Sequence, residues 1–250
     1  MNKQLIIAHR GESFIASENT LASVNLAWEN GADAVEVDIR LTKDNQVVVI
    51  HDANTSRVTG KFRWIRNTEL NELKSLDIGK SKNNKFKGEK IPTLKEVLET
   101  LPHDKKILIE IKSNYKIIPF LKDVINASEL RSDQIEIISF KLKTLIEVRK
   151  QLPTFPIYWI LEFDGFGIRK IFRSSLNEII LKAVNYNFTG LDLGVRQTLK
   201  VDTIRQIKST GLKLYVWTVN NPTIAKSLFD KGVDGITTDR AGWLKKQIET

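Results

Sequence analysis

Eight short apolar segments, each typical of a buried β-strand, are spread over the 250 residues of the chain and alternate with segments of helical periodicity. We expect strands at 5–8, 34–39, 107–111, 135–139, 157–161, 190–193, 213–218 and 235–238. We expect helices at 20–30, 119–125, 141–151, 175–187, 200–209, 222–231 and 241–248. Eight strand–helix units in a chain of this length predict an α/β fold of the (β/α)8 type, a TIM barrel. A doubly wound open sheet is the competing arrangement, but the glycine-rich nucleotide-binding motifs are missing from the sequence.

The segment 47–51 departs from this alternation because only residues 42–46 separate it from the strand before it. Such a connection is too short for a parallel crossover, so we expect an antiparallel hairpin. Asp44 and Asn45 both tolerate the backbone conformations of a tight turn. A turn centred between them pairs residues whose numbers sum to about 89. This register predicts an extra hairpin strand after the second strand, with His51 opposite Asp38.

Residues 52–92 are polar and rich in lysine and asparagine, with one helical segment at 69–76. A connection of this length is usually functional or mobile, so we expect a small insertion over the barrel mouth. The sequence has neither an internal repeat nor a linker that would divide it. We therefore expect residues 1–250 to form a single domain.

The composition narrows the classes of partner. The chain has 39 basic and 30 acidic residues, a formal charge of +9, and its basic residues are spread out rather than interleaved with aromatics. This distribution favours attraction of a small anionic substrate over nucleic-acid binding. Because there are no cysteines, disulfides, thiol catalysis and zinc–thiolate sites are excluded. We see no signal peptide and no apolar run long enough to span a bilayer, so we expect a cytoplasmic protein without integral membrane contact, whose oligomeric state stays open.

Three carboxylates lie at the ends of two expected strands. Glu36 and Asp38 are two residues apart and therefore share a strand face, and Glu110 ends a later strand. Single acids at strand ends usually form ion pairs or cap helices. Three of them in a cysteine-free chain favour an oxygen-rich site for a hard divalent cation, Mg²⁺ or Ca²⁺.

Two of the three histidines also end apolar strands, and both lie beside groups suited to phosphate chemistry. His9 is followed by Arg10, and Lys112 shares the face of Glu110. Histidine exchanges protons near neutral pH, and a guanidinium can bind two phosphate oxygens at once. His9 and His51 are therefore candidates for an acid–base pair, and the less favoured alternative for each is a buried histidine with satisfied hydrogen bonds. His103 lies in a loop and is expected at the surface.

Three further residues at strand ends have more than one interpretation. Trp217 could form an apolar wall for a small polyol or could simply pack in the core. Asn220 and Asp239 are expected to cap helices or to support the site from behind.

These residues belong to a longer ordered set of short motifs that runs almost from end to end. The set is His9-Arg10-Gly11, Glu18-Asn19-Thr20, Glu36-Val37-Asp38, Leu41-Thr42-Lys43-Asp44, His51-Asp52, Arg57, Thr59-Gly60, Ile91-Pro92-Thr93-Leu94, Glu110-Ile111-Lys112, Ser139-Phe140, Trp217-Thr218-Val219-Asn220 and Asp234-Gly235-Ile236-Thr237-Thr238-Asp239. By this set the chain resembles the glycerophosphodiester phosphodiesterase family, within the superfamily of TIM barrels similar to phosphatidylinositol-specific phospholipase C.

The resemblance implies a TIM barrel that hydrolyses glycerophosphodiesters to sn-glycerol 3-phosphate and an alcohol. It also implies a role for each site residue: Glu36, Asp38 and Glu110 for the metal, His9 and His51 for acid–base catalysis, Arg10 and Lys112 for phosphate, and Trp217 beside the glycerol. We favour His9 as the base and His51 as the acid, an order that the sequence does not fix. Direct attack by water and attack by a neighbouring substrate hydroxyl both remain open.

Three positions depart from the family pattern. Ser17 stands where proline is common, Val58 where threonine is common, and Asn45 where glycine is usual. None is an expected metal or acid–base residue, so we expect an active enzyme. Two alternatives stay open: a lysophospholipase D-type enzyme, which exposed apolar residues at 61–65 would favour, and a phosphate-binding module without turnover.

Overall fold

The computed structural model describes residues 3–80, 82–163, 175–195 and 199–249, and it confirms the barrel. Eight parallel strands close into a ring through the pairing of the first two, β1 and β2. A ninth, β3, lies outside the ring and pairs antiparallel with β2. The strands are β1 Leu5–His9, β2 Ala34–Leu41, β3 Val47–Val49, β4 Lys106–Ile111, β5 Ile135–Ser139, β6 Ile157–Phe163, β7 Gly190–Val195, β8 Lys213–Trp217 and β9 Gly235–Thr238.

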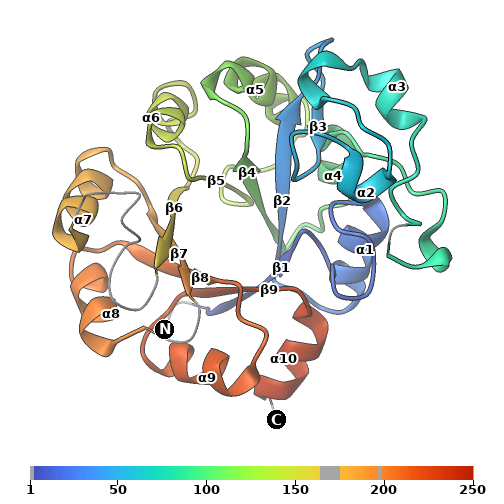
Figure 1. The fold of residues 1–250 in the computed structure, drawn as a ribbon. Coiled ribbons are helices and arrows are strands. Elements are labelled where there is room, and N and C mark those ends of the chain that lie inside the picture. The colour runs from blue at the N-terminus through green and yellow to red at the C-terminus, as the bar shows by residue number, and fades with distance from the viewer. Residues whose placement is uncertain (1–2, 81, 164–174, 196–198, 250) are drawn as a thin grey trace.

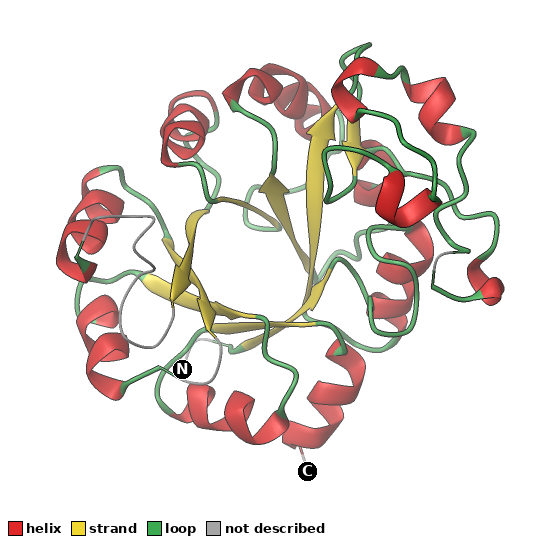
Figure 2. Ribbon diagram, in the orientation of Figure 1, coloured by secondary structure: helices red, strands yellow, loops and turns green. Residues whose placement is uncertain are grey.

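Helices surround this ring, as Figures 1 and 2 show. The α-helices are α1 Leu21–Glu29, α2 Ser56–Thr59, α3 Leu70–Lys74, α4 Leu94–Leu98, α5 Ile118–Asn126, α6 Leu142–Gln151, α7 Leu176–Asn185, α8 Val201–Lys208, α9 Pro222–Asp230 and α10 Ala241–Glu249, and three short 3-10 helices are η1 Ile65–Asn67, η2 Asn84–Phe86 and η3 Tyr115–Ile117. The ends of the expected ring strands and helices differ from these by at most two residues. The short helices α2 and α4 were missed because four or five residues are too few to show a helical period. Among the described residues, no helix is long and apolar enough to cross a membrane.

Alternation along β2 explains how the barrel carries both a core and a polar site. Val35, Val37 and Ile39 are buried in the layer between the strands and the surrounding helices. The intervening residues face the lumen, where Glu36 and Asp38 lie near the carboxyl end of the strand. The outer layer therefore stabilises the barrel, while the lumen rim is free to hold polar groups.

The hairpin is confirmed, but its expected register is wrong by one residue. The partners Ile39 and Val49 have numbers that sum to 88, and the backbone N–H of Ile50 donates to the Asp38 carbonyl. The turn is a three-residue loop that ends at Asn45, which has a left-handed φ of 61°. An odd loop length moves His51 one position past Asp38, and β3 ends before it reaches the histidine.

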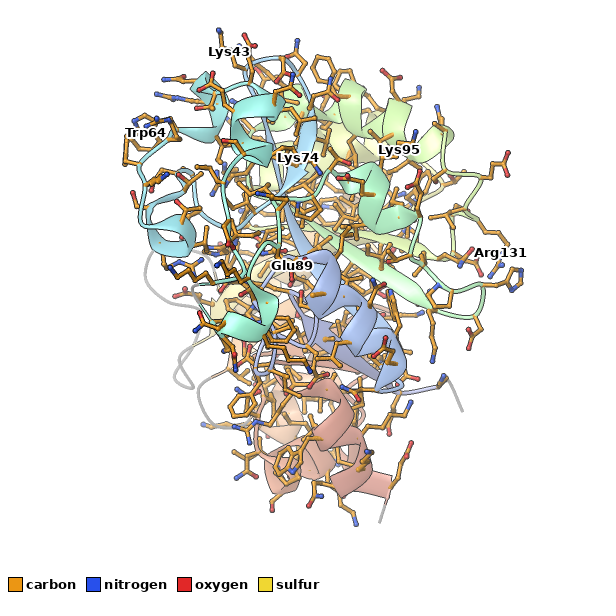
Figure 3. All side chains as sticks on the ribbon, turned by 90° about the vertical axis from the view of Figure 1, so that its right-hand side faces the viewer. Lys43, Trp64, Lys74, Glu89, Lys95 and Arg131 are labelled. Carbon is orange, nitrogen blue, oxygen red and sulfur yellow. The ribbon has the colours of Figure 1, made fainter. Side chains whose placement is uncertain are left out.

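The described residues 52–80 and 82–92 form a small subsidiary layer with its own apolar cluster. Ile65 and Leu73 are buried in that cluster, and the expected helix at 69–76 is the shorter α3. Figure 1 shows α2 and α3 outside the ring, beside β3 and α1. Figure 3 shows Trp64 at the molecular edge on the side away from Arg131, a residue of the loop that leads into β5. Trp64 is 41% exposed and stacks edge-on with Phe62, so this segment is only partly packed against the barrel.

Candidate active site

The carboxyl ends of the barrel strands surround one polar cavity of about 270 Å³. Parallel strands in a barrel all end on the same side, so residues far apart in sequence meet there. The cavity is lined by His9, Arg10, Glu36, His51, Glu110, Lys112, Ile138, Phe140, Ile160, Glu162, Asp192, Trp217 and Thr237. The structure thus brings together seven of the eight expected site residues around this cavity, and it places Asp38, the eighth, directly behind them.

The three expected carboxylates form a compact buried cluster. Asp38 on β2 is directly opposite Glu110 on β4, and one ligand oxygen from each of these and from Glu36 lies within 4.8 Å of the others. Glu36 Oε1 is buried and has no hydrogen-bond partner among the described residues. A buried anionic oxygen without a partner is costly, and a hard cation would satisfy it. The oxygen-only donor set therefore fits Mg²⁺ or Ca²⁺.

The pKa values of these carboxyls show the repulsion that such a cation would relieve. Burial raises the pKa of Glu36 well above its usual value, and the charges of Asp38 and Glu110 raise it further. Burial, followed by the charge of Asp38, raises the pKa of Glu110 to about 7. Burial alone would also raise the pKa of Asp38, but Lys112 and Arg10 hold it below its usual value. One carboxylate of the cluster is thus kept ionised by its neighbouring cations.

Two cations flank the cluster and remain charged. Lys112 Nζ lies 2.8 Å from Glu110 Oε1 and 3.3 Å from Asp38 Oδ1. Arg10 Nε lies 3.2 Å from Asp38 Oδ2. Burial opposes the charged form of each, but the surrounding carboxylates dominate and raise both pKa values. Both side chains line the cavity, where they offer positive charge to an anion.

The turn after β1 requires its particular residues. Arg10 has a φ of 57°, and its backbone N–H donates to Glu36 Oε2 over 3.0 Å. Gly11 has a φ of 81°, and a Cβ there would lie 2.5 Å from the backbone of Ser23 in α1. This left-handed turn directs Arg10 back towards the cluster. Only glycine fits at position 11, because the backbone there packs closely against Ser23.

His9 is oriented by the carboxylate of Asp239, the residue that directly follows the last strand of the ring, β9. Its Nδ1 donates to Asp239 Oδ1 over 2.7 Å, which leaves Nε2 with a lone pair when the imidazole is neutral. Asn220 donates to the other oxygen, Asp239 Oδ2, over 2.7 Å. Asn220 and Asp239 therefore support His9 from behind, which was one of the two roles expected for them. The other expected role was helix capping, but the N-cap of α9 is Asn221.

His51 is held in a corresponding way, although by a different carboxylate from the one that the hairpin register predicted. Its Nδ1 donates to Asp52 Oδ1 over 2.8 Å, and its backbone carbonyl accepts two hydrogen bonds from Arg40. Arg57 donates to the second oxygen of Asp52 over 2.5 Å. Burial lowers the pKa of His51, and the charges of Arg10 and Lys112 lower it further.

Trp217 forms part of an aromatic wall at the end of β8. It meets Phe140 edge to face, with ring centroids 5.7 Å apart. The ring lies against Gly194, where an added Cβ would come within 2.8 Å of it. The tryptophan is therefore packed against its neighbours and also lines the cavity.

The residues that orient the two histidines were only partly found from the sequence. Asp239 was expected to have a supporting role but was not connected to His9, and Asp52 was noted only as part of a motif. Asn19, which donates to Asp38 Oδ2 over 2.8 Å, was likewise noted without a role. The position of Asp239 at the end of a strand was the available signal for it. His103 is exposed, as expected.

Comparison with known proteins agrees with this geometry. The model of the glycerophosphoryl diester phosphodiesterase family matches residues 9–243. A glycerophosphodiester phosphodiesterase of Caldanaerobacter subterraneus subsp. tengcongensis is 34% identical over 242 residues, which cover 95% of this chain and 94% of the relative. A protein of the same name from Bacillus subtilis strain 168 is 32% identical over 251 residues, which cover 94% and 83%.

Solved structures agree with these relatives. A phosphodiesterase of Oleispira antarctica, in complex with the product sn-glycerol-3-phosphate, has a TM-score of 0.86 and 28% identity over 98% of this chain and 97% of the other. The family match, the relatives above 30% identity and the fold all agree. The chain therefore belongs to the glycerophosphoryl diester phosphodiesterase family and is an enzyme of that class.

Proposed function

We propose that this enzyme hydrolyses glycerophosphodiesters to sn-glycerol 3-phosphate and an alcohol, with a divalent cation and a pair of histidines. One observation carries the proposal: two imidazoles, each with Nδ1 fixed by a carboxylate, line the same cavity as the carboxylate cluster. The small-molecule substrate is supported by the sn-glycerol-3-phosphate bound to the Oleispira antarctica protein.

Glu36, Asp38 and Glu110 would hold the cation, either Mg²⁺ or Ca²⁺. When bound, such an ion offsets negative charge on the phosphoryl oxygens and helps to orient the diester. Arg10 and Lys112, the two cations that flank the cluster, would bind the same phosphate. Because both are tied to the cluster, their charges are already in position before the substrate binds.

His9 would act as the base. Asp239 has a lowered pKa, held down against the effect of burial by His9 and Asn220, and it therefore faces the imidazole as a carboxylate. A carboxylate at Nδ1 stabilises the imidazolium that forms when Nε2 takes a proton from the attacking oxygen. That oxygen belongs either to water or to a neighbouring substrate hydroxyl.

His51 would act as the acid. Its partner Asp52 shares its charge with Arg57, so it stabilises the imidazolium less than Asp239 stabilises that of His9. A histidine with a lowered pKa is a stronger acid once protonated, which suits transfer of a proton to the leaving alkoxide.

We also propose that the chain acts as one domain. The insertion is joined to the loop after β1 by Arg57, which donates to both oxygens of Glu18, and by Ser17, which donates to the Gly79 carbonyl. Both contacts lie close to the turn that carries His9 and Arg10.

The first experiment is release of sn-glycerol 3-phosphate from glycerophosphocholine, measured with Mg²⁺, with Ca²⁺ and with EDTA, beside His9→Ala. We expect turnover that needs a divalent cation and is lost in the variant. Faster turnover of lysophospholipids would favour the lysophospholipase D alternative. Folded protein that turns over neither class, with either metal, would contradict the proposal and favour a binding module.

A further inference from the structure

Most of the exposed large apolar side chains lie on the face of the barrel where the cavity opens. Ten are exposed among the described residues, and seven of these follow ring strands or lie in the insertion: Phe14 and Ile15 after β1, Tyr115 after β4, Val201 after β7, Trp243 after β9, and Phe62 and Trp64 in the insertion. The other three lie on or directly after α7. Single exposed apolar residues are normal, but their concentration on one face indicates an interaction surface.

Phe14 and Trp243 form one part of this face, beside the residue that orients His9. The backbone N–H of Phe14 donates to the carbonyl of Asp239 over 2.8 Å. The guanidinium of Arg240 lies over both rings, 4.1 Å from the centroid of Phe14 and 4.9 Å from that of Trp243. Two half-exposed rings therefore share one cation at the edge of the cavity mouth.

Phe62 and Trp64 form a second part, close to the other histidine. Trp64 pairs with Asn54, which is three residues after His51. Figure 3 shows Trp64 on the side away from Arg131, whose loop leads to the amino end of β5. These rings therefore lie towards the carboxyl ends of the strands, where the cavity opens.

Positive charge accompanies the exposed rings. Although the basic residues of the whole chain are spread out, residues 61–66 read Lys-Phe-Arg-Trp-Ile-Arg. Lys61, Arg63 and Arg66 are exposed, and none of them forms an ion pair with a described residue. Residues 52–92 contain ten basic and five acidic residues, a formal charge of +5. The face around the cavity mouth is thus both aromatic and cationic.

An anionic lipid surface matches both properties. Aromatic side chains are enriched where membranes meet water, and basic residues are attracted to anionic headgroups. A single-stranded nucleic acid also attracts cations, but it needs free ring faces on which its bases stack. Here Arg240 covers Phe14, and Phe62 meets Trp64 edge to face at 5.2 Å. A second copy of the chain would bring the same positive charge to the contact, which disfavours self-association.

We propose that an aromatic–basic rim docks this enzyme on the surface of an anionic lipid bilayer, with the mouth of the cavity towards the headgroups. The rim consists of Phe14, Phe62, Trp64 and Trp243 with Lys61 and Arg63. The contact is peripheral, so no segment has to cross the bilayer. The inference goes beyond the proposed function and does not depend on it, because docking needs no turnover.

Sedimentation with vesicles tests the docking, in EDTA so that no divalent cation links the protein to lipid phosphate. The vesicles are phosphatidylcholine alone or an equimolar mixture of phosphatidylcholine and phosphatidylglycerol. We expect binding to the mixed vesicles alone, and a loss of at least about tenfold when salt rises from about 0.1 M to about 1 M, which shortens the Debye length from about 10 Å to about 3 Å. Excess sn-glycerol 3-phosphate should not displace the protein, since the rim residues are not part of the cavity lining.

Two double variants remove the two properties of the rim separately. We expect Phe62→Ser with Trp64→Ser to lower the vesicle partition coefficient at least about tenfold, because two rings no longer leave water. Lys61→Gln with Arg63→Gln should lower it about fivefold for each charge removed. Both double variants should hydrolyse glycerophosphocholine without vesicles at the wild-type kcat/KM.

Matched double variants on the outer helices are the controls. Leu181→Ser with Val184→Ser removes two exposed apolar side chains of α7, and Lys122→Gln with Lys226→Gln removes one exposed charge each from α5 and α9. We expect either control to change vesicle binding less than about twofold, since charges far from the bilayer are screened. Thermal melting shows whether each variant is folded, and if the aromatic variant is not, the charge variant tests the rim by itself.

Several outcomes would overturn docking by the rim. They are equal binding to both kinds of vesicle, equal losses in the rim and control variants, and displacement by sn-glycerol 3-phosphate. A wild type that does not bind vesicles would also overturn it, and a rim-dependent complex with a single-stranded oligonucleotide, or a rim-dependent dimer in light scattering, would then identify the true partner. A wild type that docks but hydrolyses no diester would refute the proposed function and leave this inference intact.

Discussion

Nδ1 of His9 lies 2.7 Å from Oδ1 of Asp239, so a hydrogen bond at the candidate site joins the end of β1 to the residue that directly follows β9. β1 and β9 pair directly, which brings Asp239 beside a residue 230 positions away in the sequence. The orientation of the candidate base therefore depends on the pairing of β1 with β9.

We expect Asp239→Asn to lower kcat by roughly 10²–10⁴, because an amide no longer fixes the imidazole tautomer or stabilises its cation. Turnover of glycerophosphocholine measures the loss. Calorimetric titration with Mg²⁺ or Ca²⁺ is the control, since Asp239 is not part of the carboxylate cluster and affinity for the cation is expected to stay the same. A variant with nearly wild-type kcat would show that the pair does not orient a proton-transferring group.

The order of acid and base can be tested with the leaving group. A glycerophosphodiester of p-nitrophenol loses a phenolate that needs no protonation, so an enzyme without its acid should still cleave it. We expect His51→Ala to lose roughly 10²–10⁴ in kcat on glycerophosphocholine but less than about tenfold on the p-nitrophenyl ester. His9→Ala should be strongly impaired on both substrates. Selective recovery of His9→Ala instead would reverse the two roles.

Much of the site could be predicted because it lies on the strands. Glu36, Asp38 and Glu110 lie near the carboxyl ends of β2 and β4, and parallel pairing brings them together whatever the loops do. His9 was likewise expected at the end of a strand, and in the register of β1 and β2 it is directly opposite Glu36.

The rest depends on loops and on distant pairs. The position of His51 relative to Asp38 depends on one residue of loop length, because the left-handed Asn45 makes an odd loop that residue preferences alone do not reveal. The bond from Asp239 to His9 needs the closed ring, which local patterns do not show. Asp192 read as an ordinary strand residue, because the sequence gives no sign that its neighbours leave it unpaired.

Stability should depend on pH in a way that the divalent cation counteracts. Glu110 and Asp192 have raised pKa values of about 7 and about 8. In the unfolded chain each of these carboxyls loses its proton near its ordinary pKa of about 4, whereas in the folded state it keeps the proton until the pH reaches the raised pKa. Between these two values a rise in pH favours the unfolded chain. The contribution of each carboxyl to stability is therefore largest below its unfolded pKa and is lost as the pH rises to its folded value. Each such group costs up to about 1.4 kcal/mol per pH unit.

We therefore expect the Tm measured in EDTA to fall between about pH 4.5 and 8, because over this range the folded state keeps protons on Glu110 and Asp192 that the unfolded chain has lost. Ca²⁺ or Mg²⁺ should raise Tm more at pH 8 than at pH 6, since ligand carboxylates must give up protons to bind. Asp192→Asn should flatten the upper part of the fall in EDTA. A Tm that does not change over this range, with and without the cation, would contradict the raised pKa values.

The ion-pair chain from the insertion to the site gives a further prediction. Arg57 pairs with Glu18 and with Asp52, and Glu18 also pairs with Arg10. We expect Arg57→Gln to lower kcat by about three- to tenfold through the orientation of His51, and to lower the free energy of unfolding by no more than about 1 kcal/mol, since Arg57 is about half exposed. Arg66→Gln, on the same insertion, is the matched control and should leave kcat unchanged. Equal effects of the two substitutions would show that Arg57 acts only through overall charge.

Gly194 tests how closely Trp217 must lie against the barrel wall. A Cβ at this position would lie 2.8 Å from the indole ring, so the ring must shift away from β7. We expect Gly194→Ala to raise KM for glycerophosphocholine about tenfold and to lower the free energy of unfolding by about 1–3 kcal/mol, the usual cost of overpacking. Substrate titrations and denaturant unfolding measure the two effects.

Gly211→Ala is the control for loss of a glycine, because a Cβ at Gly211 would meet nothing within 4 Å. The φ of 85° at Gly211 strains an alanine there, so this substitution should lower stability but leave KM unchanged. An unchanged KM in Gly194→Ala would mean that the indole can move without loss, and that its contact with Gly194 does not shape the binding cavity.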